Sequence, residues 1–269
     1  MFMNFIKMHS LGNDFIIFDA RKSPITLNKN MAISLSDRHK GIGCDQIAII
    51  NGSACGYAKL EFWNSDGSRS DTCGNATRCI GKILFRETDA DNLILETAER
   101  QIECKKEGDL ISVNMGLPLF EWHEIPLSKE MNTLSLDLEG EPTATSMGNP
   151  HCTFFVDDLS KIDVSKVGHE IETDELFPEG TNVQFVEVRK RNKVKAKIWE
   201  RGAGITMASG SSSCAIAVAG VRRDILEREV KVELDGGLLE VKWAEDGVWL
   251  KGPTSEVYEG TISESFFKE

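Results

Sequence analysis

Residues 64–79 read NSDGSRSDTCGNATRC and carry the clearest fold signal in the chain. They follow a run typical of a strand at 60–63 and begin with turn-forming Asn, Ser, Asp and Gly. Over 76–86 apolar residues then recur at the three-and-four spacing of one helix face, which predicts a helix. Cys73 would stand just before its N-terminus, where free N–H groups and the helix dipole favour a thiolate and can hold a carboxylate. A buried structural cysteine before an ordinary helix is the alternative.

The composition indicates a globular protein and is compatible with a small anionic ligand in a local pocket. With 269 residues and a hydrophobic fraction of 41%, the chain can form one large domain or two of ordinary size. Its net charge of −12 is spread along the sequence, which argues against a nucleic-acid or membrane partner. Seven cysteines without metal-ligand spacing, and no apolar run at 1–7 typical of a signal peptide, favour a reduced, cytoplasmic protein.

Runs typical of strands outnumber helical patterns along the chain. Strands are expected at 15–18, 47–50, 60–63, 93–96, 111–114, 153–156, 183–188, 195–199, 231–234, 239–243 and 248–251. The clearest helices are 76–86 and 212–223, with a weaker one at 31–39. The sequence therefore predicts a sheet-rich α+β fold.

The two halves of the chain resemble each other. A shift of 136 residues, applied without a gap over roughly a hundred positions, aligns chemically similar pairs. These pairs are Gly12-Asn13 with Gly148-Asn149, Gln46 with Asn182, Trp63-Asn64 with Trp199-Glu200, Cys73-Gly74 with Ser209-Gly210, Lys106 with Lys242, and Gly116 with Gly252. We therefore expect two similar domains, 1–117 and 118–255, with the tail 256–269 packed on the first.

The repeat pairs the start of one helix, at Gly74, with the start of another, at Gly210. If the halves face each other, both helix N-termini can hold one carboxylate. Cys73 and Ser209 would then flank the bound molecule. Inversion at a carbon requires such an arrangement, because one group removes a proton and the other delivers one to the opposite face.

Several motifs in the chain resemble those of the diaminopimelate epimerase family, and the resemblance covers nearly the whole sequence. The matching segments are 7–15 (KMHSLGNDF), 38–46 (RHKGIGCDQ), 64–79, 147–151 (MGNPH), 177–183 (FPEGTNV) and 200–204 (ERGAG). The resemblance implies two pseudo-symmetric α/β domains, each with a mostly antiparallel sheet around a central helix and the active site in the cleft between them. It also implies epimerisation of LL- to meso-diaminopimelate by two acid/base groups, with no cofactor and no metal.

The resemblance also implies roles for individual residues. Cys73 and the residue at position 209 would be the catalytic pair, tuned by His151 and Glu200. Backbone donors for the reacting carboxylate would be Gly74, Asn75, Gly210 and Ser211. The distal carboxylate of the substrate would be held by Asn64, Asn149, Asn182 and Arg201. Glu200 and Arg201 would lie at the second domain's entry to the site and contribute to substrate binding there. The pocket would also be lined by Asn13 and Gln46.

Ser209 departs from the family pattern, which has a second catalytic cysteine at this place. A hydroxyl is far less acidic than a thiol, and a gap of about five pKa units makes its ionisation ~7 kcal/mol more costly. The resemblance therefore implies an enzyme that is weakened or inactive, through either an introduced or a natural change. Gly180 is a second departure, because the family often has Arg there.

Two other functions stay open. One is racemisation of another amino acid, such as glutamate, lysine or histidine. The other is amino-acid binding without catalysis, which Ser209 makes conceivable. A homodimer is among the expected assembly states.

Overall fold

A computed structural model describes residues 2–268. The chain forms two compact units. The first contains the residues up to Val113 together with those from Gly252 onward, and the second is Asn114–Lys251. Within the described residues, no helix is both long enough and apolar enough to cross a membrane.

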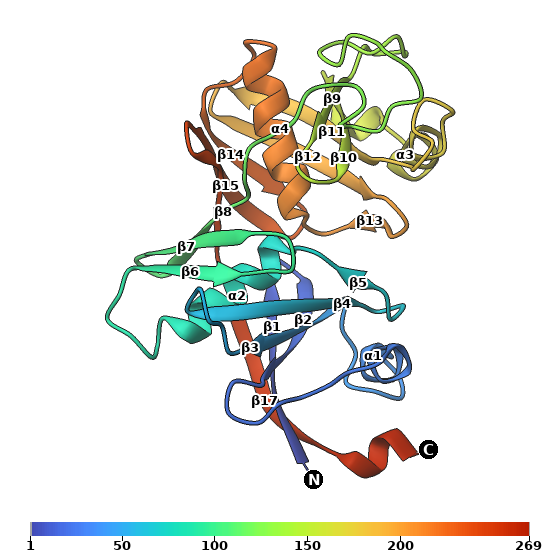
Figure 1. Cartoon of the computed structure of the whole chain (residues 1–269). Coiled ribbons are helices and arrows are strands. Elements are labelled where there is room, and N and C mark those ends of the chain that lie inside the picture. The colour runs from blue at the N-terminus through green and yellow to red at the C-terminus, as the bar shows by residue number, and fades with distance from the viewer. Residues whose placement is uncertain (1, 269) are drawn as a thin grey trace. The chain divides into compact units, whose positions relative to one another are not determined.

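The first unit is a sheet that surrounds the helix α2 (Figure 1). Its elements are β1 (Phe2–Ser10), β2 (Asn13–Asp19), α1 (Lys29–Ser36), β3 (Gln46–Asn51), β4 (Ala58–Asn64), β5 (Arg69–Ser70), α2 (Gly74–Leu84), β6 (Asn92–Glu96), β7 (Gln101–Glu107), β8 (Leu110–Asn114), β17 (Ser255–Ser263) and the 3₁₀ helix η2 (Glu264–Lys268). The pairing order is β17-β1-β2-β3-β4-β6-β7-β8, with β5 also beside β4. α2 contacts β1, β2 and β7.

Strands β2 and β3 are parallel neighbours and are buried on both faces. Phe15–Phe18 and Ile47–Ile50 accordingly read as continuous apolar runs, as expected when both faces of a strand are covered. α1 packs on β3 and contributes Ala32 and Leu35 to the core there. These two central strands hold Asn13 and Gln46 at their N-terminal ends.

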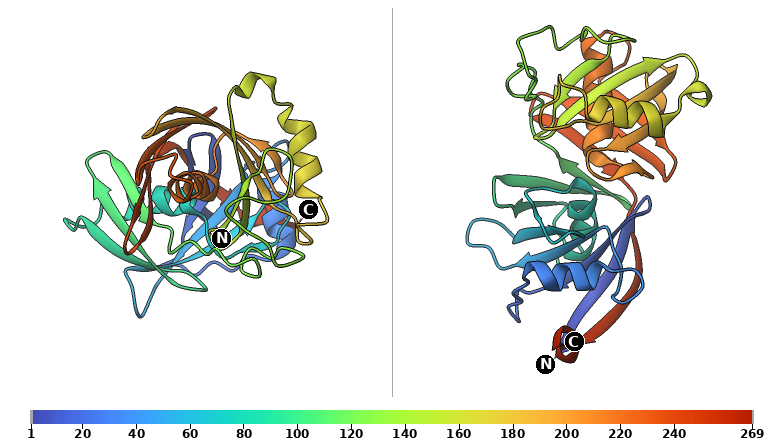
Figure 2. Two further views of the ribbon diagram at one scale, coloured as in Figure 1. Left: turned by 90° about the horizontal axis from the view of Figure 1, so that it is seen from above. Right: turned by 90° about the vertical axis from the view of Figure 1, so that its right-hand side faces the viewer.

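The second unit is built in the same way around α4. Its elements are β9 (Thr143–Ser146), β10 (Pro150–Val156), the 3₁₀ helix η1 (Leu159–Lys161), α3 (Val164–Glu172), β11 (Asn182–Lys190), β12 (Lys193–Glu200), β13 (Gly204–Thr206), α4 (Gly210–Arg222), β14 (Glu229–Leu234), β15 (Gly237–Ala244) and β16 (Gly247–Gly252). α4 contacts β9, β10, β11, β14 and β15, and the left view of Figure 2 looks almost along its axis.

Helix α4 is buried on nearly all sides. Every residue from Ser212 to Gly220 is buried, so no polar face is needed. Its small residues let neighbouring segments approach closely: a Cβ placed on Gly220 would lie 2.3 Å from Cδ1 of Leu226, in the segment between α4 and β14. A helix enclosed by a sheet is thus encoded by a run rich in Ala, Ser and Gly.

The strand registers of the two units match. Ile47 pairs with Trp63, and Val183 pairs with Trp199, which are the positions 136 residues later. The parallel pair of Phe15 with Gln46 has its counterpart in His151 with Asn182 at the same shift.

The expectation of one gapless shift is wrong beyond the helices. Cys104 pairs with Val113, whereas the equivalent pair in the second unit is Val241 with Leu250, a shift of 137. The second unit therefore has one extra residue between the start of α4 and β14. α4 has 13 residues and α2 has 11, so the insertion is absorbed around the end of the helix.

The predicted α+β class is confirmed, because strands dominate and helices are few. The helix bounds differ from the expected ones. α2 and α4 each begin two residues earlier than predicted, and α1 ends at Ser36 rather than at position 39. The N-caps Asn28 and Cys73 each accept a backbone N–H of the first turn through their side chains, whereas Ser209 precedes α4 without such a bond.

Candidate active site

Cys73 is the N-cap of α2, in an extended backbone conformation. Its Sγ accepts a hydrogen bond from the Ala76 backbone N–H at 3.4 Å, and its carbonyl accepts from both the N–H and the hydroxyl of Thr77 at 2.8 Å. The side chain is partly exposed, while Gly74 and Asn75 are buried. A sulfur that receives an N–H at the positive end of a helix is favoured as thiolate.

A directed chain of amides lies beside Cys73. Asn13 donates to the Asp45 carboxylate at 2.9 Å and accepts from Asn75 at 3.1 Å. Asn75 in turn accepts from the Arg78 guanidinium at 2.8 Å. A carboxylate only accepts and a guanidinium only donates, so both amide orientations are fixed. Arg78 is fully buried and also donates to Ser10 at 2.6 Å.

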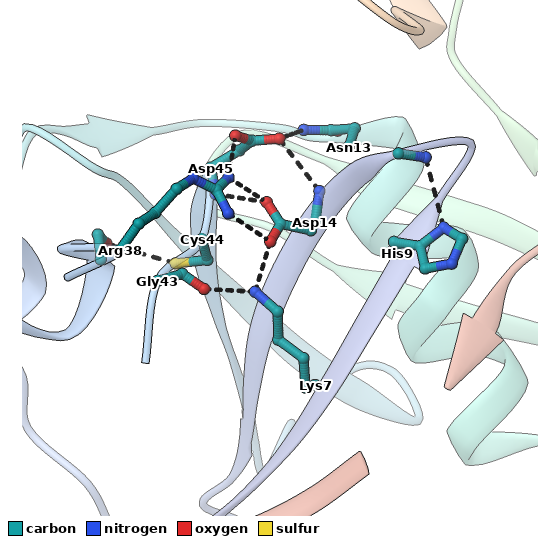
Figure 3. Close-up of polar contacts among 10 residues, drawn as sticks. Lys7, His9, Asn13, Asp14, Arg38, Gly43, Cys44 and Asp45 are labelled. Carbon is teal, nitrogen blue, oxygen red and sulfur yellow. Dashed lines mark hydrogen bonds and ion pairs between the residues drawn. The ribbon is translucent and has the colours of Figure 1, made fainter. Parts of the chain in front are cut away.

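A cluster of charged side chains contacts the Asp45 end of this hydrogen-bond chain (Figure 3). Arg38 donates to Asp14 at 2.7 and 3.0 Å and to Asp45 at 2.8 Å. Lys7, only 8% exposed, donates to Asp14 at 2.5 Å and to the Gly43 carbonyl. Burial of Asp14 alone would raise its pKa, but the hydrogen bonds from Arg38 and Lys7 outweigh burial and lower the pKa to about 2. The Asp14 carboxylate therefore stays charged at neutral pH.

Gln46 and Asn64 form a second amide pair in the first unit. Gln46 donates to the Asn64 carbonyl at 2.8 Å, and Asn64 donates to Ser68 at 2.9 Å. The two residues are directly opposite in the β3–β4 register. The strand pairing therefore brings these two predicted site residues together.

Ser209 occupies the equivalent position in the second unit, as the N-cap of α4. Its carbonyl accepts from the N–H of Ser213 at 3.1 Å and from its hydroxyl at 2.8 Å, as the Cys73 carbonyl does from Thr77. The side chains differ. The Ser209 hydroxyl makes no helix-capping bond and instead donates to the Glu200 carboxylate at 3.0 Å. Gly210 is buried and Ser211 is partly exposed.

His151 is fully buried between two amides. Its Nε2 lies 2.9 Å from the Asn149 carbonyl oxygen, and its Nδ1 lies 3.0 Å from the Gln184 nitrogen. Burial, followed by the nearby positive charge of Arg201, lowers the pKa of His151 to about 3. The imidazole is therefore neutral at physiological pH.

Asn182 and Arg201 are joined through the backbone. The Asn182 side chain accepts from the Arg201 N–H at 3.1 Å and donates to the Pro150 carbonyl at 2.8 Å. The Arg201 guanidinium is exposed and donates to the Glu179 carbonyl at 3.0 Å. A Cβ at Gly180 would lie 3.1 Å from Arg201 Cδ, in a backbone with φ of +71°. Glycine at 180 therefore leaves room for this Arg201 conformation.

Sequence reasoning did not assign a site role to Asp45, Arg78 or Gln184, which hydrogen-bond to predicted site residues. Asp45 directly precedes the predicted Gln46, and Arg78 lies one helical turn after Asn75. Gln184 follows Asn182 at the period-two spacing of one strand face. Each is a polar or charged residue close in sequence to a predicted site residue, and only the structure shows which side chains they contact.

Comparisons with known proteins agree with the family resemblance of the sequence motifs. The family model described as diaminopimelate epimerase matches residues 5–120 and 143–262. A diaminopimelate epimerase of Acidiphilium cryptum is 42% identical over 264 residues, covering 96% of this chain and 95% of that protein. A diaminopimelate epimerase of Zymomonas mobilis is 44% identical over 267 residues, covering 97% of each chain.

A solved structure has the same fold. It is the Bacillus anthracis phenazine biosynthesis protein of the PhzF family, with a TM-score of 0.71. The match covers 98% of this chain and 99% of that one, at 15% identity. At this identity the likeness supports the fold alone.

Proposed function

Because the chain belongs to the diaminopimelate epimerase family, we propose that it epimerises LL-diaminopimelate to meso-diaminopimelate by a cofactor-independent two-base mechanism, at a rate reduced by Ser209. The observation that carries this proposal is the matched pair of helix N-caps, Cys73 and Ser209, with the same hydrogen bonds to their carbonyls. Two equivalent groups, one per unit, suit a reaction that inverts a carbon.

In this mechanism the Cys73 thiolate removes the α-proton from one face, and the group at position 209 delivers a proton to the other. In the reverse direction the two roles exchange. The α-carboxylate binds the free N–H groups that begin α2 and α4, at Gly74, Asn75, Gly210 and Ser211. Its charge is thereby balanced while negative charge develops at the α-carbon.

Ser209 limits the reaction in both directions. As a base it must lose a proton about five pKa units less acidic than that of a thiol, which adds ~7 kcal/mol. Glu200 accepts the Ser209 hydroxyl hydrogen and so can assist its removal, but it cannot supply this difference. We propose that Glu200 and His151 tune the two faces of the site.

The far end of the substrate is proposed to bind Asn64, Asn149, Asn182 and Arg201. Three amides and a guanidinium supply hydrogen-bond donors that suit a second amino-acid group better than an apolar side chain. Asn13 and Gln46 are proposed to line the same pocket, oriented by Asp45 and Asn64. We further propose that 1–117, with the tail 256–269 packed on it, and 118–255 are two similar domains.

Binding without catalysis is the second candidate, because Ser209 donates to Glu200 and no thiol stands at this helix end. The test is deuterium uptake at the α-carbon in deuterated water, by mass spectrometry, for this chain and for Ser209→Cys. We expect slow uptake from LL-diaminopimelate with this chain and much faster uptake with the variant. Binding without uptake in either form would establish the binding protein. Uptake into glutamate or lysine, but not diaminopimelate, would establish a different racemase.

A further inference from the structure

A buried polar chain connects the core of the second unit to Asn149. Thr153 donates to the Gln184 carbonyl at 2.9 Å, and Gln184 Nε2 approaches His151 Nδ1 at 3.0 Å. His151 Nε2 then approaches the Asn149 carbonyl at 2.9 Å. Thr153, Gln184 and His151 are all 0% exposed. Thr153 and Gln184 are directly opposite in the β10–β11 register, so the sheet fixes the start of the chain.

The proton on His151 has one position in this arrangement. Nδ1 faces an NH₂ group and must accept, while Nε2 faces a carbonyl and must donate. A charged imidazolium would point an N–H at the Gln184 NH₂ group. Only the neutral ring with its proton on Nε2 satisfies both neighbours.

We propose that Gln184 is a positioning residue that, through the Nε2–H tautomer of His151, turns the Asn149 NH₂ group outward as a donor for a ligand carboxylate. The Asn149 carbonyl is held by His151, so its nitrogen is what remains to meet a ligand. Its contact with the Ser211 hydroxyl is long, at 3.5 Å, and uses one of its two hydrogens. This inference rests on the proposed function, because it explains how one of its pocket residues recognises an anion.

The opposite direction of the chain would reverse the specificity. If Gln184 presented its carbonyl, His151 would carry its proton on Nδ1, and Nε2 would accept from Asn149. Asn149 would then offer its carbonyl oxygen, which repels a carboxylate. The position of a single buried proton therefore distinguishes a site for an anion from a site that rejects one.

The first test locates that proton in the ligand-free protein. Long-range proton–nitrogen NMR spectra distinguish the two ring nitrogens, and comparison with His151→Gln assigns the signals. We expect a protonated Nε2 and a bare Nδ1, unchanged from about pH 5 to pH 9, since the group is buried and neutral. A proton on Nδ1, or a titration within that range, would overturn the inference. No turnover is involved, so this result is independent of the proposed reaction.

The second test uses Asn149→Asp, which keeps an acceptor toward His151 and replaces the NH₂ group by an oxygen. We expect the tautomer to persist and diaminopimelate to bind at least tenfold more weakly, with alanine binding unchanged. A shift of the proton from Nδ1 to Nε2 on this substitution would show the reversed chain. Equal losses for both ligands would show that Asn149 does not read the carboxylate.

Gln184→Glu tests the positioning role itself. A carboxylate cannot donate to Nδ1, so His151 should gain a second proton at neutral pH, visible in the same spectra. Thr153→Val is the matched control, because it removes a neighbouring hydroxyl and leaves the Gln184 NH₂ group in place. A His151 ring that stays singly protonated in Gln184→Glu would contradict the proposed positioning role of Gln184.

Discussion

Charged side chains orient the amides of the candidate site. Asp45 and Arg78 fix the amides of Asn13 and Asn75 from opposite ends of one hydrogen-bond chain. Asp14 in turn holds Arg38, which binds Asp45. These charged groups orient amide side chains, and each of them is buried or hydrogen-bonded.

Asp14→Asn should lower the free energy of unfolding by about 3 kcal/mol at pH 7, because it leaves Lys7 buried without its carboxylate. The Asp14 pKa is depressed, so its contribution is fully present above 3.8 and is lost as pH falls toward about 2. Urea denaturation at pH 7 and at pH 3 measures both effects. Asp224→Asn, at an exposed ion pair, is the control and should change stability by less than about 1 kcal/mol. An equal loss in both variants would contradict this account.

Cys73 should react with iodoacetamide faster than any other cysteine at pH 7. Its sulfur receives a backbone N–H at a helix N-terminus. Burial raises the pKa of Cys44 to about 11 and of Cys79 and Cys104 to about 12, which keeps those thiols protonated. Peptide mapping by mass spectrometry gives the order of modification. Cys55 is exposed but caps no helix, so its faster labelling would refute the expectation.

Strands β7 and β8 approach the central helix α2 closely, so a larger side chain on the packed face of α2 should lower the stability of the protein. A Cβ on Gly81 would lie 2.6 Å from Cys104 Sγ and 3.1 Å from Ile111 Cγ2. Gly81→Ala gains about 1 kcal/mol of helix propensity, but overpacking costs about 1–3 kcal/mol. We expect a net loss of up to about 2 kcal/mol, measured by thermal unfolding. Gly52→Ala, which meets nothing within 4 Å, should be neutral, and a stabilised Gly81→Ala would show that the core yields.

The strands that the sequence revealed are those buried on a face. Phe15–Phe18 and Ile47–Ile50 are apolar because both faces are covered. β17 was missed because its residues are mostly exposed and form a strand only by pairing with β1. α3 was missed as well, although Asp163 caps it and accepts from the Lys166 N–H. A strand such as β17, which forms only by pairing with a distant strand, leaves no local pattern of apolar residues in the sequence.

The candidate site residues likewise divide into those with a local sequence signal and those without one. Cys73 and Ser209 could be located because a helix start has a local signature of turn residues followed by an apolar face. Gln184 could not be linked to His151, because a cross-strand contact depends on the register of β10 and β11. The roles of Asp45, Arg78 and Gln184 therefore emerged only from the structure, whereas the ligand-facing candidates were predicted from the sequence.

In the whole molecule, the internal repeat relates both the strand registers and the two proposed catalytic positions. Two units with matching registers each place one residue at a helix N-cap, and those residues are 136 positions apart. One extra residue after the start of α4 shifts the later strands without moving the cap. The two units therefore share strand registers and N-cap backbone hydrogen bonds, but differ in the capping side chain, Cys73 in one and Ser209 in the other.

The rate of conversion of LL- to meso-diaminopimelate by Ser209→Cys, relative to this chain, tests the two-base proposal most directly. Loss of a positioned acid or base costs ~10²–10⁴-fold, so restoring the thiol should raise the rate by at least that factor. The added substitution Cys73→Ser should abolish the gain. Comparable rates for this chain and Ser209→Cys would contradict the account.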